Sequence, residues 1–370
     1  MPGTKSRKPD KRRTLRKGWT TGACATAATR AAYGALLTGS FEDPVSITLP
    51  RGQTPSFALS ESALRGGAAM AAIVKDAGDD PDVTHGALIR ATVRLGEPGA
   101  GVIFRAGEGV GTVTLAGLPV AVGEPAINPA PRRMMTAVVA ELAALHGAAG
   151  DVEITIAVDH GERLAERTMN ARLGIIGGLS ILGTTGIVTP YSCAAWIASI
   201  HQGVDVARAA GLEHVAGATG KTSESAVRAL YGLDEQALLE MGDFAGALLK
   251  YIRRHPVARL TVAGGFAKIS KLAQGHMDLH SGRSDVDIAG LAGHLSDLGA
   301  PTDTVSLARA AHSAGAVLAL AGTMLLADRV AAKALGVVQE NLGDAEITVD
   351  VTIFDRAGAL IGRAGLDDGA

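Results

Sequence analysis

The chain has little cysteine, few aromatic residues and almost no net charge. Only Cys24 and Cys193 occur in 370 residues, with no CxxC pair and no Cys/His cluster, so we expect no disulfide framework and no zinc or iron–sulfur site. Aromatic residues make up 3% of the chain, which argues against nucleic-acid bases stacked on aromatic side chains. Lys and Arg number 35 against 37 Asp and Glu, so no overall field attracts nucleic acid or a membrane surface.

An export signal and a continuous membrane-spanning helix are also missing. The basic start, with KRRTLRKGW, has no apolar signal core behind it, so residues 1–17 are expected to form a basic disordered tail. Residues 173–200 lack charge, but five glycines and Pro190 interrupt them, which favours a buried strand, loop and helix over a lipid-exposed span. We therefore predict a cytoplasmic protein that contacts neither membrane nor nucleic acid.

The common catalytic and nucleotide-binding motifs are absent. GATGKT at 217–222 is too short for a Walker A loop, and no GxGxxG, HExxH or GxSxG occurs. His276 and His280 flank Asp278 in HMDLH, but the following SGRSD predicts a loop, so these residues are expected to contact a ligand rather than a metal. Cys24 lies in an alanine-rich helix pattern, and nucleophilic catalysis has no support.

The length of the chain predicts two domains, both of the α/β class. We expect an α+β domain over 18–165, with mainly antiparallel strands in VSITL, ALIRATVRL, GVIFRA, GTVTL, LPVAV and DVEITIAV. Its helices should run from Thr21 to a stop at Gly39, and from Asn128 to His146.

The second predicted domain, 166–370, alternates strands, glycine loops and helices, which is typical of a mainly parallel sheet covered by helices. A helix should start at Thr189–Pro190, and Asp243 should cap another. Loops around Gly177, Gly217 and Gly264 should open together at the carboxyl edge of that sheet, where such folds bind ligands.

Several segments, taken in order, resemble one known family. They are LRKGWTTGACATAAT, GEPAINPAPRRMM, NARLGIIGGLSILGTTGIVTPYS, GATGKTSE, GDF and GGFAKISKLAQGHMDLHS. Together they resemble the cobalt-precorrin-5B C1-methyltransferase family, CbiD, over about residues 15–355. The resemblance implies transfer of a methyl group from S-adenosylmethionine to C1 of the cobalt-bearing tetrapyrrole, giving cobalt-precorrin-6A in cobalamin synthesis.

The resemblance assigns no residue roles, but the implied reaction and the residue pattern together predict where donor and substrate bind. The glycine stretch 173–187 is expected to cradle S-adenosylmethionine, and tight packing without ligand contact is the competing interpretation. Cations near helix starts would hold the carboxylates of the macrocycle. The expected donor-binding residues are Gly174, Gly177, Gly178, Gly183, Thr184, Thr185, Gly186 and Glu224. The expected substrate-binding residues are Arg16, Thr20, Thr21, Gly22, Asn128, Arg132 and Lys268. Asp243 and His280 are the candidate catalytic residues, and no metal site is expected.

Two other functions stay open from the sequence. A corrinoid-binding protein without catalysis would bind the macrocycle but not S-adenosylmethionine. A nucleotide-dependent enzyme would use the Gly217 loop and need Lys221 for phosphate binding. The sequence does not decide whether the chain forms a homo-oligomer.

Overall fold

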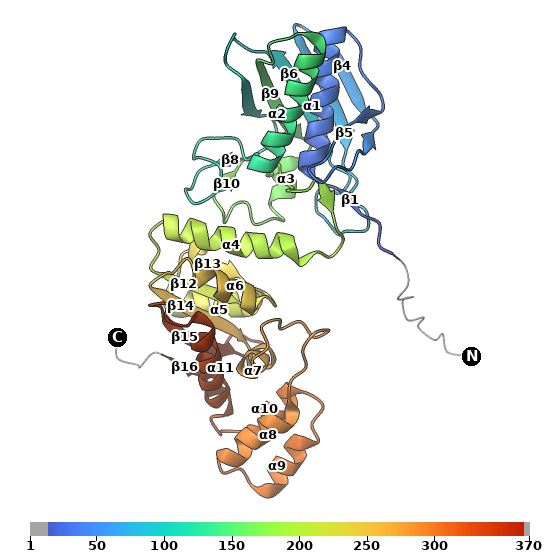
Figure 1. The fold of residues 1–370 in the computed structure, drawn as a ribbon. Helices are drawn as coiled ribbons and strands as arrows, with labels where there is room; N and C mark the ends of the chain where they lie inside the picture. Colours follow the sequence, from blue (N-terminus) through green and yellow to red (C-terminus); the bar gives the residue numbers. More distant parts are fainter. Residues whose placement is uncertain (1–13, 366–370) are drawn as a thin grey trace, which may run out of the picture. The chain divides into compact units, whose positions relative to one another are not determined.

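The computed structural model describes residues 14–365, which divide into two compact units (Figure 1). The first unit extends to Thr114 and also holds Pro119–Ser192, and the second holds Leu115–Leu118 and the chain from Cys193 onward. The sequence placed a boundary at 165–166 instead. Residues 166–192 belong to the first unit because strands within them pair with its strands. Most of the predicted basic tail, residues 1–13, lies outside the described residues.

The first unit packs two long helices, α1 and α2, on one face of a five-stranded sheet (Figure 1). The strand order is β4–β5–β6–β9–β7, and all neighbours are antiparallel except β7 and β9, as predicted for this half. The helices are α1 (Thr21–Thr38), α2 (Pro129–His146) and α3 (Gly161–Ala165). The strands are β1 (Gly18–Trp19), β2 (Val45–Ser46), β3 (Ser56–Phe57), β4 (Glu61–Arg65), β5 (Ala68–Val74), β6 (Leu88–Leu95), β7 (Val102–Ala106), β8 (Thr112–Val113), β9 (Val152–Val158), β10 (Ile175–Ile176) and β11 (Ile187–Val188).

Helix α1 has the ends that the sequence predicts. The Thr20 hydroxyl accepts a hydrogen bond from the Ala23 N–H at 3.1 Å, and Gly39 ends the helix at φ 80°, a conformation that favours glycine. Small alanine side chains let this helix lie close to β5 and β6 and bury most of its length. The strand predicted at LPVAV is wrong, because residues 118–122 form turns and bends.

The second unit contains a sheet in the order β13–β12–β14–β15–β16. The first four strands are parallel and only β16 is antiparallel, which confirms the predicted parallel sheet. The strands are β12 (His214–Ala218), β13 (Leu238–Glu240), β14 (Arg259–Gly265), β15 (Thr348–Phe354) and β16 (Leu360–Ala364). The helices are α4 (Cys193–Ala209), α5 (Lys221–Tyr231), the 3₁₀ turn η1 (Glu235–Ala237), α6 (Ala245–Ile252), α7 (Phe266–Ala273), α8 (Ile288–Asp297), α9 (Thr302–Arg309), α10 (Ala314–Ala321) and α11 (Leu326–Leu342).

Three local predictions in this half need correction. Helix α4 begins at Cys193 rather than at Thr189–Pro190, because Tyr191 has a positive φ of 56° that a helix does not allow. Asp243 does not cap α6, since Phe244 is the residue before the helix and no side chain caps it. The Gly177 loop is not at the edge of the parallel sheet, because the adjoining strand β10 pairs with β8 in the first unit.

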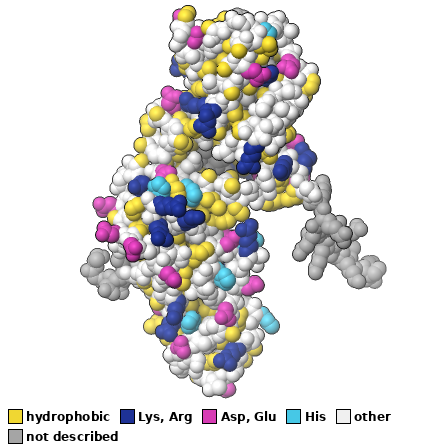
Figure 2. All heavy atoms as spheres, in the orientation of Figure 1, with side chains coloured by type: hydrophobic (Ala, Val, Ile, Leu, Met, Phe, Trp, Pro, Cys, Tyr) yellow, Lys and Arg dark blue, Asp and Glu magenta, His cyan; other side chains and the backbone are white. Residues whose placement is uncertain are grey.

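The described part of the chain has no helix both long enough and apolar enough to cross a bilayer. Figure 2 shows basic and acidic side chains interspersed on the face that it draws, with apolar side chains between them. This distribution matches the near-zero net charge of the sequence.

Candidate functional site

A cleft of about 400 Å³ lies at the carboxyl edge of the parallel sheet in the second unit. Its walls come from α4, from the loops after β12 and β13, and from α7. The volume is within the range of about 300–1,000 Å³ that small-molecule sites occupy. The lining residues are Trp196, Thr219, Gly220, Lys221, Glu240, Gly242, Asp243, Phe244 and Lys268.

An ion pair joins two sides of this cleft. The Lys268 ammonium, from α7, lies 3.1 Å from Asp243 Oδ1 and donates a hydrogen bond to the Thr219 carbonyl at 2.8 Å. Asp243 Oδ1 is shielded from solvent and receives no well-directed hydrogen bond, although it is within ion-pair distance of Lys268. The Asp243 carboxylate is therefore held in place but keeps capacity to accept further hydrogen bonds.

The apolar wall of the cleft consists of Trp196 and Phe244, whose ring centroids are 6.4 Å apart. The Trp196 indole N–H donates to the Glu240 carbonyl at 2.9 Å, which fixes the ring, yet 44% of the residue is exposed. Gly242 adopts φ 58°, and a Cβ there would lie 3.2 Å from the Trp196 ring. The loop after β13 thus needs glycine to bring its backbone against this ring.

The floor of the cleft is the turn from β12 into α5. Gly220 precedes α5, no side chain caps the helix, and Lys221 is exposed in its first turn. The helix start supplies N–H groups that attract negative charge, whereas a lysine there opposes the helix dipole. Lys221 therefore adds positive charge at a place where helix stability alone does not favour it.

The loop that carries His280 lies beside the cleft. The Leu279 N–H donates to the Asp243 carbonyl at 2.8 Å, and the buried Lys271 ammonium donates to the Leu279 carbonyl at 3.0 Å. His280 is exposed, and its Nδ1 accepts from the Gly282 N–H at 3.0 Å, so its ring does not line the cleft. Glu224 is in the first turn of α5, also outside the lining.

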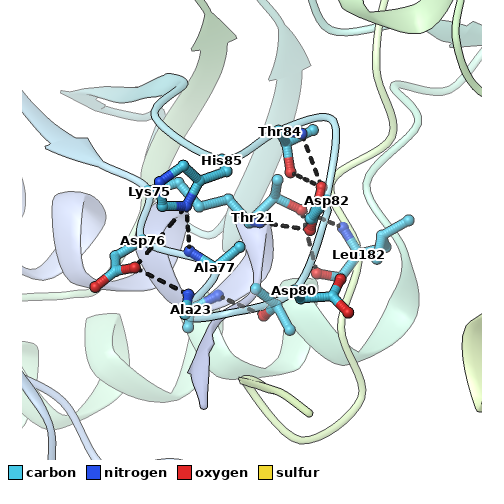
Figure 3. Close-up of polar contacts among 12 residues, drawn as sticks. Thr21, Ala23, Lys75, Asp76, Ala77, Asp80, Asp82, Thr84, His85 and Leu182 are labelled. Atoms are coloured by element: carbon cyan, nitrogen blue, oxygen red, sulfur yellow. Dashed lines mark hydrogen bonds and ion pairs between the residues drawn. The ribbon is translucent and has the colours of Figure 1, made fainter. Parts of the chain in front are cut away.

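The TTG segment at the start of α1, predicted to bind substrate, contacts the glycine stretch instead. The N–H groups of Thr20 and Gly22 donate to the carbonyls of Gly186 and Leu182, each at 3.0 Å. Figure 3 shows Thr21 directed at Leu182, whose N–H donates to the Thr21 hydroxyl at 2.9 Å. These groups are already used within the first unit, which supports the packing interpretation for this segment.

Close packing also accounts for most glycines between 173 and 187. A Cβ on Gly178 would lie 2.3 Å from the backbone of Gly109, one on Gly183 2.3 Å from Thr20, and one on Gly186 2.5 Å from Leu49. At Gly177 the space is open. Gly174 is buried, Thr184 is exposed and Thr185 is half-buried. The predicted role of these residues in donor binding stays a prediction.

The two arginines predicted to bind substrate make ion pairs within the first unit. Arg16 forms a two-pronged pair with Asp76, which lowers the pKa of that carboxyl to about 2. Arg132 donates to Glu124 at 3.1 Å and to the Ile127 carbonyl at 2.8 Å, so it fastens the segment before α2. Asn128 precedes α2 without a side-chain capping bond.

A buried ion pair supports the loop that Arg16 contacts. The Lys75 ammonium is 2.6 Å from Asp82, and Asp82 also accepts from the Thr84 hydroxyl at 2.6 Å (Figure 3).

Burial raises the pKa of the nearby Cys24 thiol to about 12, so this cysteine is protonated at neutral pH. Among the described residues no group of His, Cys, Asp and Glu side chains could hold a metal ion.

Comparison with known proteins finds matches to one family along nearly the whole chain. The family model described as CbiD matches residues 8–190, and the model described as CbiD, C-terminal domain, matches residues 278–365. A protein of Paramagnetospirillum magneticum named cobalt-precorrin-5B C(1)-methyltransferase is 59% identical over 95% of this chain and 98% of its own length. The chain belongs to the CbiD family. The resemblance of the sequence motifs to CbiD is thus confirmed.

Two further curated relatives have the same name. Proteins of the same name from Methylorubrum extorquens and Rhodospirillum rubrum are each 58% identical, covering 94% and 96% of this chain and 97% and 99% of their own lengths. A crystal structure titled as cobalamin biosynthesis protein (cbiD) from Archaeoglobus fulgidus is 25% identical over 68% of this chain and 77% of its own, with a TM-score of 0.38.

In this CbiD chain, all of the residues that line the cleft fall between the ranges that the two family models match. Lining residues such as Trp196 and Lys268 fall in the segment 191–277, which the curated relatives nonetheless cover. The sequence predicted Asp243 and Lys268, named Lys221 for the nucleotide-dependent alternative, and missed Trp196 and Phe244 as cleft residues. Their positions in the sequence could have indicated this role, since each stands at a helix start or a strand-to-helix turn near the predicted carboxyl edge.

Proposed function

We propose that this chain transfers a methyl group from S-adenosylmethionine to C1 of cobalt-precorrin-5B. The observation that carries the proposal is the identity of 55–59% to relatives of that name, along nearly the whole of both chains. The relatives' name specifies a methyltransferase and its acceptor, and S-adenosylmethionine is the donor class that we add. The cytoplasmic location and the homo-oligomer stay predictions from the sequence.

The methyl transfer requires little chemical catalysis by protein side chains. A carbon of the electron-rich macrocycle attacks the methyl group on the sulfonium, the methyl–sulfur bond breaks, and the thioether S-adenosylhomocysteine leaves with the electron pair of that bond. The donor is already activated, so the protein acts by holding the two molecules in line, an effect that can supply about 7–11 kcal/mol. Cobalt is part of the substrate and is not a resident metal of the enzyme.

The candidate residues divide into two groups under this proposal. Asp243 and Lys268 form an ion pair in the cleft, with His280 in the loop beside it, and either Asp243 or His280 could accept a proton that the macrocycle releases. Arg16 and Arg132 would meet substrate carboxylates only by exchanging their ion pairs with Asp76 and Glu124. A substrate role for these arginines stays a prediction.

The test is an anaerobic incubation of the purified chain with S-adenosylmethionine and cobalt-precorrin-5B. We expect the macrocycle to gain one methyl group by mass spectrometry and NMR to place it at C1. The same reaction with the metal-free precorrin shows whether cobalt is required. An unmodified macrocycle in both reactions, with protein shown to be folded by circular dichroism, would reject the methyltransferase. Macrocycle binding without turnover would then favour the non-catalytic carrier.

A further inference from the structure

We infer that S-adenosylmethionine binds in the cleft of the second unit and not in the glycine stretch at 173–187. The inference rests on the proposed function for the identity of the donor. In this arrangement the adenine stacks on the wall of Trp196 and Phe244, and the ribose hydroxyls donate to Asp243. The methionine carboxylate binds at the start of α5 beside Lys221.

The cleft has an aromatic wall on which a nucleoside base can stack. Trp196 is fixed by its bond to the Glu240 carbonyl and still exposes 44% of its surface, so its ring offers a rigid apolar face. Planar aromatic groups stack on such faces.

The polar groups of the cleft match the donor from end to end. Asp243 lines the cleft with a side chain that is 24% exposed, and ribose hydroxyls are donors that its accessible carboxylate edge can bind. The Lys268 ammonium, 3.1 Å from Asp243 Oδ1, holds that carboxylate in place. The start of α5 and Lys221 supply N–H groups and positive charge for a carboxylate.

The charge balance of the cleft disfavours the macrocycle as its occupant. Two acidic residues, Glu240 and Asp243, line it together with two lysines. S-adenosylmethionine carries a sulfonium and an ammonium besides its single carboxylate, so it has a group of opposite sign for the acids and one for the lysines. A macrocycle with many carboxylates has groups of opposite sign for the lysines alone. The groups of the first unit, by contrast, are used in packing: the glycine stretch closes on Gly109, Thr20 and Leu49.

The two tryptophans of the chain allow the two candidate sites to be compared directly. Trp196 lies in the cleft, whereas Trp19 lies in β1 and pairs with Ile187 at the end of the glycine stretch. The Trp19→Phe variant leaves Trp196 as the single reporter, and Trp196→Phe leaves Trp19. Titration of each with S-adenosylhomocysteine should change the emission of Trp196 and leave that of Trp19 unchanged. The opposite pattern would overturn the inference.

A matched pair of carboxylate variants measures the contribution of the cleft. We expect Asp243→Asn to weaken S-adenosylhomocysteine binding about tenfold or more in calorimetry, since an ionised acceptor is lost. Asp297→Asn is the control, because Asp297 also lies in the second unit, 3.1 Å from a cation, Arg329, but outside the cleft. The Asp297→Asn variant should bind S-adenosylhomocysteine with the same affinity as the wild type. Equal affinity in both variants would contradict the inference.

The binding experiment separates failure of the site from failure of the function. Binding reported by Trp196 without methyl transfer would leave the site standing and reject the proposed activity. Methyl transfer with a silent Trp196 and an unaffected Asp243→Asn variant would confirm the activity and reject the site. Failure of the free protein to bind S-adenosylhomocysteine would also reject the site, because every group assigned to the donor lies on the second unit itself.

Discussion

His214 is a partly buried imidazole at the first position of β12, away from the cleft. Its Nε2 lies 2.8 Å from the hydroxyl of Thr261, which donates to the fully buried Asp350 at 2.6 Å. Burial, with a further contribution from the charge of Arg259, lowers the pKa of His214 to about 4. The folded protein therefore keeps this histidine neutral at a pH where the unfolded chain would protonate it.

This difference predicts a loss of stability in mild acid. Between pH 6.5 and 4 the unfolded chain binds a proton at His214 that the folded chain does not, so unfolding becomes more favourable as pH falls, by at most about 1.4 kcal/mol per pH unit. Urea unfolding, followed through Trp196 in the Trp19→Phe background, should show this slope, and His214→Gln should flatten it. Asp76, with its pKa at about 2, loses its contribution only below about pH 4. If the free energy of unfolding has the same pH dependence with His214 and with the His214→Gln substitution, this account is wrong.

At the scale of elements, the glycine stretch packs closely against the backbone at Gly109, which lies between β7 and β8. Gly178 and Gly177 are adjacent but differ in surroundings. A Cβ at Gly178 would lie 2.3 Å from the Gly109 backbone, whereas one at Gly177, where φ is 85°, would meet open space.

We predict that Gly177→Ala costs about 1–2 kcal/mol, the strain of a left-handed residue, and that Gly178→Ala costs more because the backbone must move. Chemical denaturation of the first unit, followed through Trp19 in the Trp196→Phe background, measures both. Affinity for S-adenosylhomocysteine should be the same in the two variants. Similar stability losses would reject the packing account, and loss of affinity in Gly177→Ala would return the donor to this stretch.

Elements with local signals were predicted well. Helix α1 has its threonine cap and closing glycine in the sequence, and the β12–α5 and β14–α7 units have glycine turns between an apolar run and an amphipathic one. The hairpin of β4 and β5 was missed because its alanines give no polar alternation. The sheet of the Gly177 loop was misassigned because β10 pairs with β8, far away in the sequence, and no local signal reports such pairing.

The candidate site was predicted in part for the same reason. Asp243 and Lys268 each follow a strand of the parallel sheet, so topology alone brings them to one edge. The bond from Trp196 to the Glu240 carbonyl joins residues that are distant in the sequence, and only the folded chain shows it. The glycines at 178 and 183 were assigned to a ligand because the sequence cannot distinguish space for a ligand from space for another backbone.

At the scale of the whole molecule, the two units have separate hydrophobic cores. One is built around α1, α2 and the antiparallel sheet, and the other around the parallel sheet with α11. Because each of these two cores lies within one unit, each unit can unfold as its own cooperative block. A ligand held by one unit should then stabilise that block selectively.

We therefore predict two thermal transitions in calorimetry, only one of which responds to S-adenosylhomocysteine. A ligand at a hundred times its dissociation constant stabilises its binding unit by about 2.7 kcal/mol. Thermal unfolding followed by Trp196 or Trp19 emission assigns each transition to a unit. The midpoint temperature of the Trp196 transition should rise, and that of the Trp19 transition should not change. Asp297→Asn should keep this shift, whereas a tenfold loss of affinity in Asp243→Asn should remove about half of it. A shift confined to the Trp19 transition would place the donor on the first unit. A single transition that shifts as a whole would show that the units unfold together, and ligand binding would then stabilise the entire chain.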